Sequence, residues 1–69
     1  MNIALLSIGN ELLSGDTLNT NAAWIGRKVT ELGCSVHRQI TVPDDGPSII
    51  DGLNRFIDSK ANYIIITGG

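Results

Sequence analysis

Two short runs of almost unbroken apolar residues limit most strongly what this chain can fold into. They cover residues 2–8 and 63–67, and the second run is rich in β-branched side chains. Such runs are typical of strands that are buried on both faces of a sheet. A third segment, residues 35–42, alternates imperfectly between apolar and polar residues, which indicates a half-exposed edge strand. The alternation places Val36, Ile40 and Val42 on one face of this strand, and His37, Gln39 and Thr41 on the other.

Two amphipathic helices are predicted between these strands, over about residues 21–32 and 47–59. The apolar positions are Ala22, Ile25, Val29 and Leu32 in the first helix, and Ile49, Ile50, Leu53, Phe56 and Ile57 in the second. The candidate N-cap residues are Asn19 and Thr20 for the first helix, and Asp45 and Gly46 for the second. Gly33 follows the first helix, where a C-terminal glycine is common.

The order strand, helix, strand, helix, strand predicts an α/β fold with parallel strands and right-handed crossovers. The more continuous apolar runs predict that the first and third strands are central and the second is at an edge. The expected strand order is therefore 2-1-3. In such sheets, ligands bind beyond the carboxyl ends of the strands, where the direction of the crossovers reverses. Residues 9–18 and 67–69 are thus expected to form the site.

Length and composition narrow the class of protein. Sixty-nine residues are about half of an ordinary domain. With 42 % hydrophobic and 17 % charged residues, the chain is neither a disordered segment nor a coiled coil. The formal net charge is −2, and the five basic residues form no run longer than two. Neither nucleic acid nor a membrane is therefore expected as a partner.

The cellular compartment is suggested by the single cysteine, Cys34, and by the N-terminal sequence. One cysteine forms no internal disulfide, and the N-terminus lacks the basic region and cleavage site of a signal peptide. We therefore expect a cytoplasmic protein. The last apolar run leads into Gly68 and Gly69, which normally connect to further structure. We expect residues 1–69 to be the N-terminal part of one incomplete domain.

The loop after the first strand is the most unusual segment. Residues 9–21 contain two glycines and two carboxylates, and they lead to a helix N-terminus, where N–H groups and the helix dipole favour anions. The simpler alternative is that the glycines only form turns and Asn19 or Thr20 only caps the helix. The spacing of Gly9 and Gly15 matches neither a P-loop nor a dinucleotide-binding fingerprint.

Three motifs in this chain resemble those of the N-terminal domain of the CinA competence/damage-inducible protein family. They are Gly9-x-Glu11-Leu12-Leu13-x-Gly15, Asn19-Thr20-Asn21-Ala22, and Thr67-Gly68-Gly69. The resemblance covers all 69 residues, and the N-terminal domain of eukaryotic FAD synthases is also similar. It implies a three-layer α/β/α, Rossmann-like molybdopterin-binding fold of the MoaB/MogA type.

The resemblance also implies an activity. CinA proteins are associated with metal-dependent hydrolysis of ADP-ribose at its diphosphate, and a separate C-terminal domain often deamidates nicotinamide mononucleotide. Relatives with this fold bind molybdopterin, and either adenylylate it or insert molybdenum. In the family, the third strand is followed by Thr-Gly-Gly-Leu-Gly-Pro-Thr and an acidic pair, which would lie beyond residue 69.

The expected site joins the loop after the first strand to the turn after the third. Glu11 is the candidate catalytic residue, and a divalent metal of unspecified identity is expected on Glu11 and Asp16. The candidate residues for binding a nucleotide or pterin are Gly9, Gly15, Asn19, Thr20, Asn21, Thr67, Gly68 and Gly69. His37 is expected to be an ordinary surface residue, and the longer parent to be a candidate homo-oligomer.

Three interpretations of function follow. The first is part of a nucleotide diphosphate hydrolase, in which the 69 residues alone are inactive. The second is a non-catalytic module that binds molybdopterin or a nucleotide. The third is a structural fragment with no function of its own.

Overall fold

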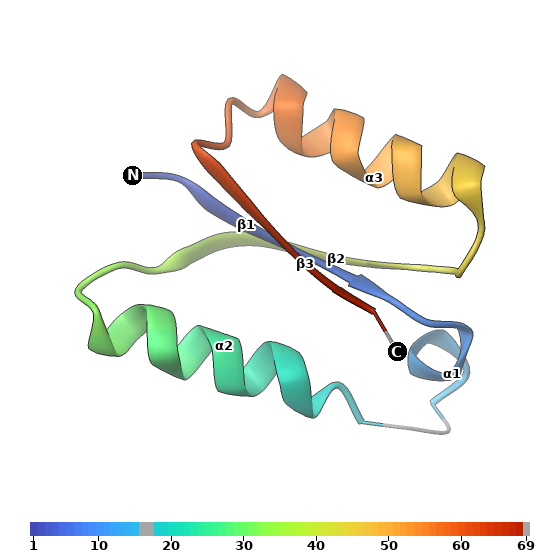
Figure 1. The fold of residues 1–69 in the computed structure, drawn as a ribbon, viewed down its shortest axis with the longest axis horizontal. Coiled ribbons are helices and arrows are strands. Elements are labelled where there is room, and N and C mark those ends of the chain that lie inside the picture. Colours follow the sequence, from blue (N-terminus) through green and yellow to red (C-terminus); the bar gives the residue numbers. More distant parts are fainter. Residues whose placement is uncertain (16–17, 69) are drawn as a thin grey trace.

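The computed structural model describes residues 1–15 and 18–68, which form a three-stranded sheet with helices on both of its faces (Figure 1). In chain order, the elements are β1 (Ile3–Ile8), α1 (Asn10–Ser14), α2 (Thr20–Glu31), β2 (Val36–Val42), α3 (Gly46–Asp58) and β3 (Tyr63–Gly68). The strand order is β2-β1-β3, and both strand pairs are parallel. The predicted α/β fold and strand order are therefore confirmed.

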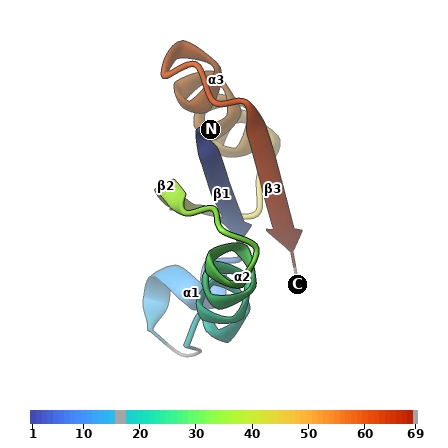
Figure 2. The same cartoon turned by 90° about the vertical axis from the view of Figure 1, so that its left-hand side faces the viewer.

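The helices lie in two separate layers. Figures 1 and 2 show α3 against one face of the sheet and α2 against the other. On the α3 face, Phe56 is fully buried and packs with Ala4, Leu6 and Val42 in the hydrophobic core. Burying one such aromatic side chain stabilises the fold by about 1.5–3 kcal/mol. This core holds α3 across β1 and β2.

The helix ends were predicted well by their capping residues. Asn19 caps α2 through its side chain, which accepts a hydrogen bond from the Ala22 N–H at 3.2 Å. Asp45 caps α3 in the same way, with the Ser48 N–H at 2.8 Å. Gly33, after α2, has a φ of 84°, a left-handed conformation that glycine adopts with little strain.

The buried faces of the helices are narrower than the apolar periodicity predicts. Ile50 and Ile57 were expected to face the sheet, but they are 60 % and 62 % exposed. Successive helical residues are separated by about 100° around the axis, and Phe56 already defines the inner line of α3. Ile57, one step from Phe56, therefore lies on the flank. Leu32 is 82 % exposed because it is the C-cap residue of α2, beyond the last turn.

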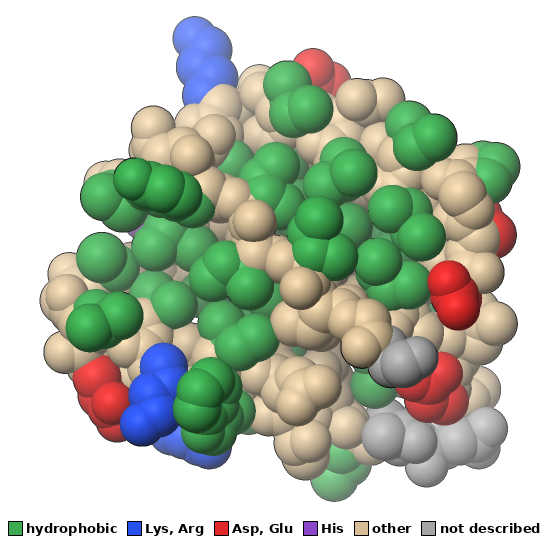
Figure 3. All heavy atoms as spheres, viewed as in Figure 1, with side chains coloured by type: hydrophobic (Ala, Val, Ile, Leu, Met, Phe, Trp, Pro, Cys, Tyr) green, Lys and Arg blue, Asp and Glu red, His purple; other side chains and the backbone are tan. Residues whose placement is uncertain are grey.

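The strand β3 occupies an edge of the described sheet, although its apolar run predicts a central strand. It pairs with β1 along one side, and no other described strand pairs with its second side. Tyr63 and Ile66 are 59 % and 52 % exposed. Figure 3 shows hydrophobic side chains gathered over β3 and the adjoining helix flanks.

An irregularity at the start of β2 changes the predicted assignment of its two faces. Ile3 pairs with Val36 and Ala4 pairs with Arg38, so His37 is one extra residue in the strand. Because neighbouring residues alternate between faces, Val36 lies on the α2 face, opposite to Ile40 and Val42. The expected grouping of these three residues on one face is therefore wrong for Val36.

Among the described residues, no helix combines the length and the apolar character that crossing a lipid bilayer demands.

Candidate functional site

The carboxyl ends of β1 and β3 lie side by side and define the position of the candidate site. Ser7 pairs with Thr67, and Ile8 pairs with Gly68. Figure 1 shows that the C-terminal end of β3, the N-terminus of α2 and α1 gather at this end of the sheet. The strand order therefore brings the segment after β1 and the end of β3 to the same end of the sheet.

Asn19 connects this edge to α2. Its Oδ1 accepts the capping hydrogen bond from Ala22, while its Nδ2 donates a hydrogen bond of 2.8 Å to the Ser7 hydroxyl oxygen. Ser7 is fully buried. Paired residues of neighbouring strands project from the same face of a sheet, so Thr67 lies on the same side as Ser7 and Asn19. Asn19 and Thr67, two predicted site residues, are thus brought together.

Thr20 and Asn21 form the exposed first turn of α2. The Thr20 N–H donates to the Leu18 carbonyl at 2.9 Å, and the Ala22 N–H is held by Asn19. Within residues 1–15 and 18–68, the Asn21 N–H has no recorded partner. A free N–H at the positive end of a helix of 12 residues favours an anion.

The segment after β1 is not the continuous loop that the sequence predicts, because it contains the short helix α1. Gly15 ends this helix with a φ of 83°, so its place in the motif reflects a left-handed turn. The Asn10 Oδ1 accepts a hydrogen bond of 3.0 Å from the Asp44 N–H, and the Gly9 N–H donates to the Val42 carbonyl at 3.1 Å. These contacts attach α1 to the end of β2, on the side of the sheet away from β3.

Glu11 lies in the first turn of α1, and its side chain folds back toward Gly9. A Cβ atom added to Gly9 would come within 2.5 Å of the Glu11 Oε1. The carboxylate therefore occupies the space that a side chain at Gly9 would fill. This explains the pairing of glycine and glutamate in the motif: glycine leaves room for the carboxylate at the end of β1.

The described residues offer one carboxylate for the expected metal. No group of three or more His, Cys, Asp or Glu side chains that could hold a metal ion occurs within residues 1–15 and 18–68. Asp16, the second expected ligand, and Gly69 lie outside the described residues. A Mg²⁺-type ion is usually bound by about one or two carboxylates together with substrate phosphates and water. Glu11 fits such a sparse ligand set as one member.

Ser7 is a residue of the candidate site that the sequence motifs do not indicate. It is the single hydroxyl-bearing residue in the apolar run 2–8, and the structure buries it against Asn19. A polar residue that interrupts a buried strand needs a hydrogen-bond partner, and this requirement was the available signal.

Comparison with known proteins gives a consistent family. A family model described as "Probable molybdopterin binding domain" matches residues 4–69. A protein of Pyrobaculum aerophilum is 48 % identical over 65 residues, which are 94 % of this chain and 24 % of that protein. A protein of Archaeoglobus fulgidus is 41 % identical over 69 residues, which are all of this chain and 30 % of that protein.

A solved structure has a similar fold. The crystal structure of the protein CinA from Thermoplasma acidophilum, described as being of unknown function, superimposes with a TM-score of 0.87 at 34 % identity. The match covers 94 % of this chain and 38 % of that protein. The chain thus spans roughly a quarter to two fifths of the length of the relatives it matches.

Proposed function

The chain belongs to the family of probable molybdopterin-binding domains, and from this premise we propose that it binds the diphosphate of a nucleotide for metal-dependent hydrolysis. The proposed substrate is ADP-ribose or a related nucleotide diphosphate in the cytoplasm. Addition of water across the diphosphate of ADP-ribose gives AMP and ribose 5-phosphate. The longer protein that carries this chain would perform the reaction.

The hydrogen bond between Asn19 and Ser7 is the observation that most supports this proposal. It holds the positive end of α2 at the carboxyl end of the central strand β1, which is where ligands of open α/β sheets bind. The exposed N–H of Asn21 and the helix dipole both favour a phosphate there. Thr67, on the same face of β3, adds a hydroxyl beside the proposed phosphate position.

Gly68 leaves the end of β3 uncovered. An added Cβ at Gly68 would meet only the Ile8 Cβ, at 4.0 Å. Because Gly68 pairs with Ile8, this open space lies on the α3 face, opposite to the face that carries Thr67 and Asn19. We propose that the diphosphate reaches the backbone of β3 at the end of the strand, where glycine places no side chain in between.

Glu11 is proposed to hold the divalent metal, with Asp16 as a second ligand. When bound, such an ion supplies positive charge that polarises water and neutralises phosphate oxygens. The chain itself orients the diphosphate through the N-terminus of α2 and the end of β3. The Glu11 side chain, constrained by its position over Gly9, places a negative charge at the carboxyl end of β1.

The test is release of AMP from ADP-ribose with Mg²⁺, measured in the longer protein that contains this chain. We expect Glu11→Gln to lower kcat by about 100-fold or more, because glutamine keeps the shape but loses the charge that a metal needs. Glu31→Gln is the matched control, since Glu31 lies in the last turn of α2 and pairs with Lys28. Equal rates in both variants would show that the chemistry lies elsewhere.

Gly9→Ala provides an independent probe of the same site. The added methyl group would displace the end of the flexible Glu11 side chain and leave the backbone in place. We expect a loss of activity with little change in melting temperature. The 69-residue chain alone is expected to bind the nucleotide weakly and not to cleave it.

A second candidate function, molybdopterin binding without hydrolysis, is favoured by the description of the matched family. The phosphate of a pterin would use the same N-terminus of α2. Binding of molybdopterin together with no AMP release would establish this alternative. Failure of both ligands to bind would refute both proposals and leave a structural role.

A further inference from the structure

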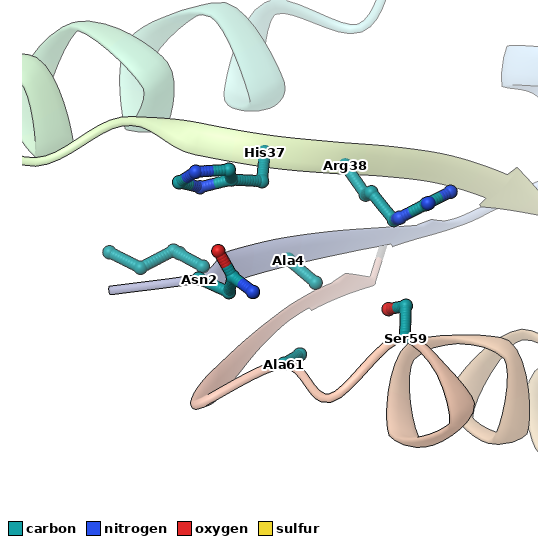
Figure 4. Close-up of a pocket in the computed structure, with 7 residues that line it drawn as sticks. Asn2, Ala4, His37, Arg38, Ser59 and Ala61 are labelled. Atoms are coloured by element: carbon teal, nitrogen blue, oxygen red, sulfur yellow. The ribbon is translucent and has the colours of Figure 1, made fainter.

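A cavity of about 480 Å³ lies at the amino ends of β1 and β2, at the opposite end of the sheet from the nucleotide site (Figure 4). Its volume is in the range of sites for small molecules. We propose that this cavity binds a small organic anion, a carboxylate or phosphate that also carries a hydroxyl or amino group, with Arg38 as its main contact. The proposal is independent of the proposed hydrolase activity.

The irregularity in β2 builds one wall of the cavity. In a regular strand, His37 and Arg38 would point to opposite faces. Because His37 is one extra residue between the pairs Ile3–Val36 and Ala4–Arg38, both side chains line the same cavity. Bulges of this kind occur often at sheet edges and beside binding sites, where they redirect a side chain.

Small residues and a hydrogen-bonded frame leave the space open. Ala4 and Ala61 line the cavity between Arg38 and Ser59 on one side and His37 and Asn2 on the other (Figure 4). The Asn2 N–H donates to the Asn62 Oδ1 at 2.8 Å, and the Asn62 N–H donates to the Asn2 carbonyl at 2.8 Å. These two bonds fix the start of β1 against the segment that leads into β3.

Arg38 carries a positive charge with no recorded carboxylate partner in the part of the chain that the structure describes. The ion pairs recorded there join Lys28 to Glu31 and Arg55 to Asp51. A guanidinium group forms two parallel hydrogen bonds with a carboxylate or phosphate, which makes arginine the usual residue for such recognition. The anionic group of the ligand is therefore assigned to Arg38.

The wall of the cavity that faces Arg38, formed by the end of α3, favours a hydrogen-bond donor. The Ser59 hydroxyl donates to the Phe56 carbonyl at 2.9 Å, so its oxygen is left to accept a hydrogen bond from the ligand. Ser59 is also the C-cap of α3, and the negative end of a helix disfavours an anion but favours an amine or hydroxyl. Arg38 and Ser59 together favour a ligand that carries an anionic group and a hydrogen-bond donor close to each other.

Lys60 lies between Ser59 and Ala61 in the sequence and forms the turn that ends α3. Its φ is 61°, and the bonds from Lys60 N–H to the Ile57 carbonyl and from Ala61 N–H to the Phe56 carbonyl form a helix-ending turn. Glycine usually occupies this position because other residues are strained there. The turn thus sets the positions of Ser59 and Ala61, the residues on either side of Lys60, which both line the cavity.

The test is a titration of the ¹⁵N-labelled protein with acetate, glycolate, inorganic phosphate and glycerol phosphate at constant ionic strength. We expect saturable shifts of the Ala4, Arg38 and Ser59 amide signals. Glycolate should bind more tightly than acetate because only glycolate carries a hydroxyl for Ser59. The tighter of glycolate and glycerol phosphate identifies the anionic group.

Variants distinguish specific binding in the cavity from nonspecific attraction of anions to surface charge. Arg38→Gln should weaken binding by about tenfold or more, and Arg38→Lys should restore part of it because it keeps the charge but not the paired donors. Arg55→Gln removes the same charge from the exposed pair with Asp51 and should leave binding unchanged. Equal weakening by Arg38→Gln and Arg55→Gln, or shifts spread evenly over the chain, would overturn the proposal.

Discussion

The side-chain nitrogen of Asn19 donates a hydrogen bond of 2.8 Å to the hydroxyl oxygen of Ser7, twelve positions earlier in the central strand. The oxygen of the same side chain caps α2. One residue therefore begins the helix and attaches it to the sheet. The candidate nucleotide site depends on this attachment, because α2 presents its free N–H group there.

Asn19→Ala is expected to lower the free energy of unfolding by about 2 kcal/mol, since it removes a helix cap and leaves a buried hydroxyl without its partner. Urea denaturation of both proteins measures the difference. Asn54→Ala, on the exposed surface of α3, serves as the control and should change stability by less than about 0.5 kcal/mol. A double-mutant cycle with Ser7→Ala should show coupling of about 1 kcal/mol, and strictly additive effects would contradict the interaction.

Two glycine-to-alanine substitutions should have opposite effects. At Gly52, an added Cβ would lie 2.9 Å from the Leu6 Cδ1 and 3.3 Å from the Val42 Cγ1. This overpacking should destabilise the protein by about 1–3 kcal/mol. At Gly26 no atom lies within 4 Å of the added Cβ, so the substitution should stabilise α2 by about 0.5–1 kcal/mol. Thermal unfolding of both variants measures these changes in stability. A stabilised Gly52→Ala variant would refute the close packing of α3 on Leu6 and Val42.

Asp45 should make folding sensitive to acid. Asp45 accepts a hydrogen bond from the Ser48 N–H and another from the Ser48 side chain. These hydrogen bonds lower the pKa of the Asp45 carboxyl in the folded state. The stabilisation of the folded state by the ionised Asp45 is therefore complete above the unfolded pKa of about 3.9. It is lost as the pH falls through the lower pKa of the folded state. Asp45→Asn keeps the accepting oxygen without the titration. The melting temperatures of the two proteins should converge as the pH is lowered through this range, and a constant difference would argue against the capping carboxylate.

Lys60→Gly should stabilise the protein by about 1 kcal/mol, because glycine relieves the left-handed strain at φ 61°. Chemical denaturation measures this change. Lys28→Gly, inside α2, is a suitable comparison and should destabilise by about 1 kcal/mol. A loss of stability in Lys60→Gly would mean that the lysine side chain contributes more than the strain.

The open edge of β3 should cause the 69-residue chain to self-associate. Residues 63–67 carry no charge, and unpaired edges of this type add further strands. Ile66→Lys should raise the fraction of monomer in sedimentation velocity runs at increasing concentration. Leu32→Lys places the same change at an exposed position at the end of α2 and should have no such effect. A monomeric wild-type chain at all concentrations would show that the edge is harmless.

Strand order and helix caps could be predicted because each depends on a local signal. The apolar runs indicate β1 and β3, and Asn19, Asp45 and Gly33 each satisfy the helix terminus beside them. Burial on the flanks of the helices was overestimated because periodicity gives the direction of an apolar face but not its width. Ile50 and Ile57 illustrate this limit.

The features that the sequence did not predict have no signal in the residues close to them. The helix α1 has five residues, too few to show a helical period. The extra residue at His37 emerges only when β2 is paired with β1, and the alternating pattern alone assigns Val36 to the wrong face. Of the candidate site, Asn19 and Thr67 lie on one face as the topology implies, while Glu11 is directed to Gly9 by a turn that the sequence does not specify.

The central position of β1 has a consequence for the order of events during synthesis on the ribosome. Of the three described strands, the earliest in the sequence is the one with a partner on each side, and Asn2 bonds to Asn62, sixty positions later. Ala4, Leu5 and Leu6 therefore pair with β2 at the earliest, and their second side stays unpaired until β3 has been translated. Such distant pairing slows folding and prolongs the exposure of apolar segments. This nascent chain should therefore depend on chaperones until β3 emerges.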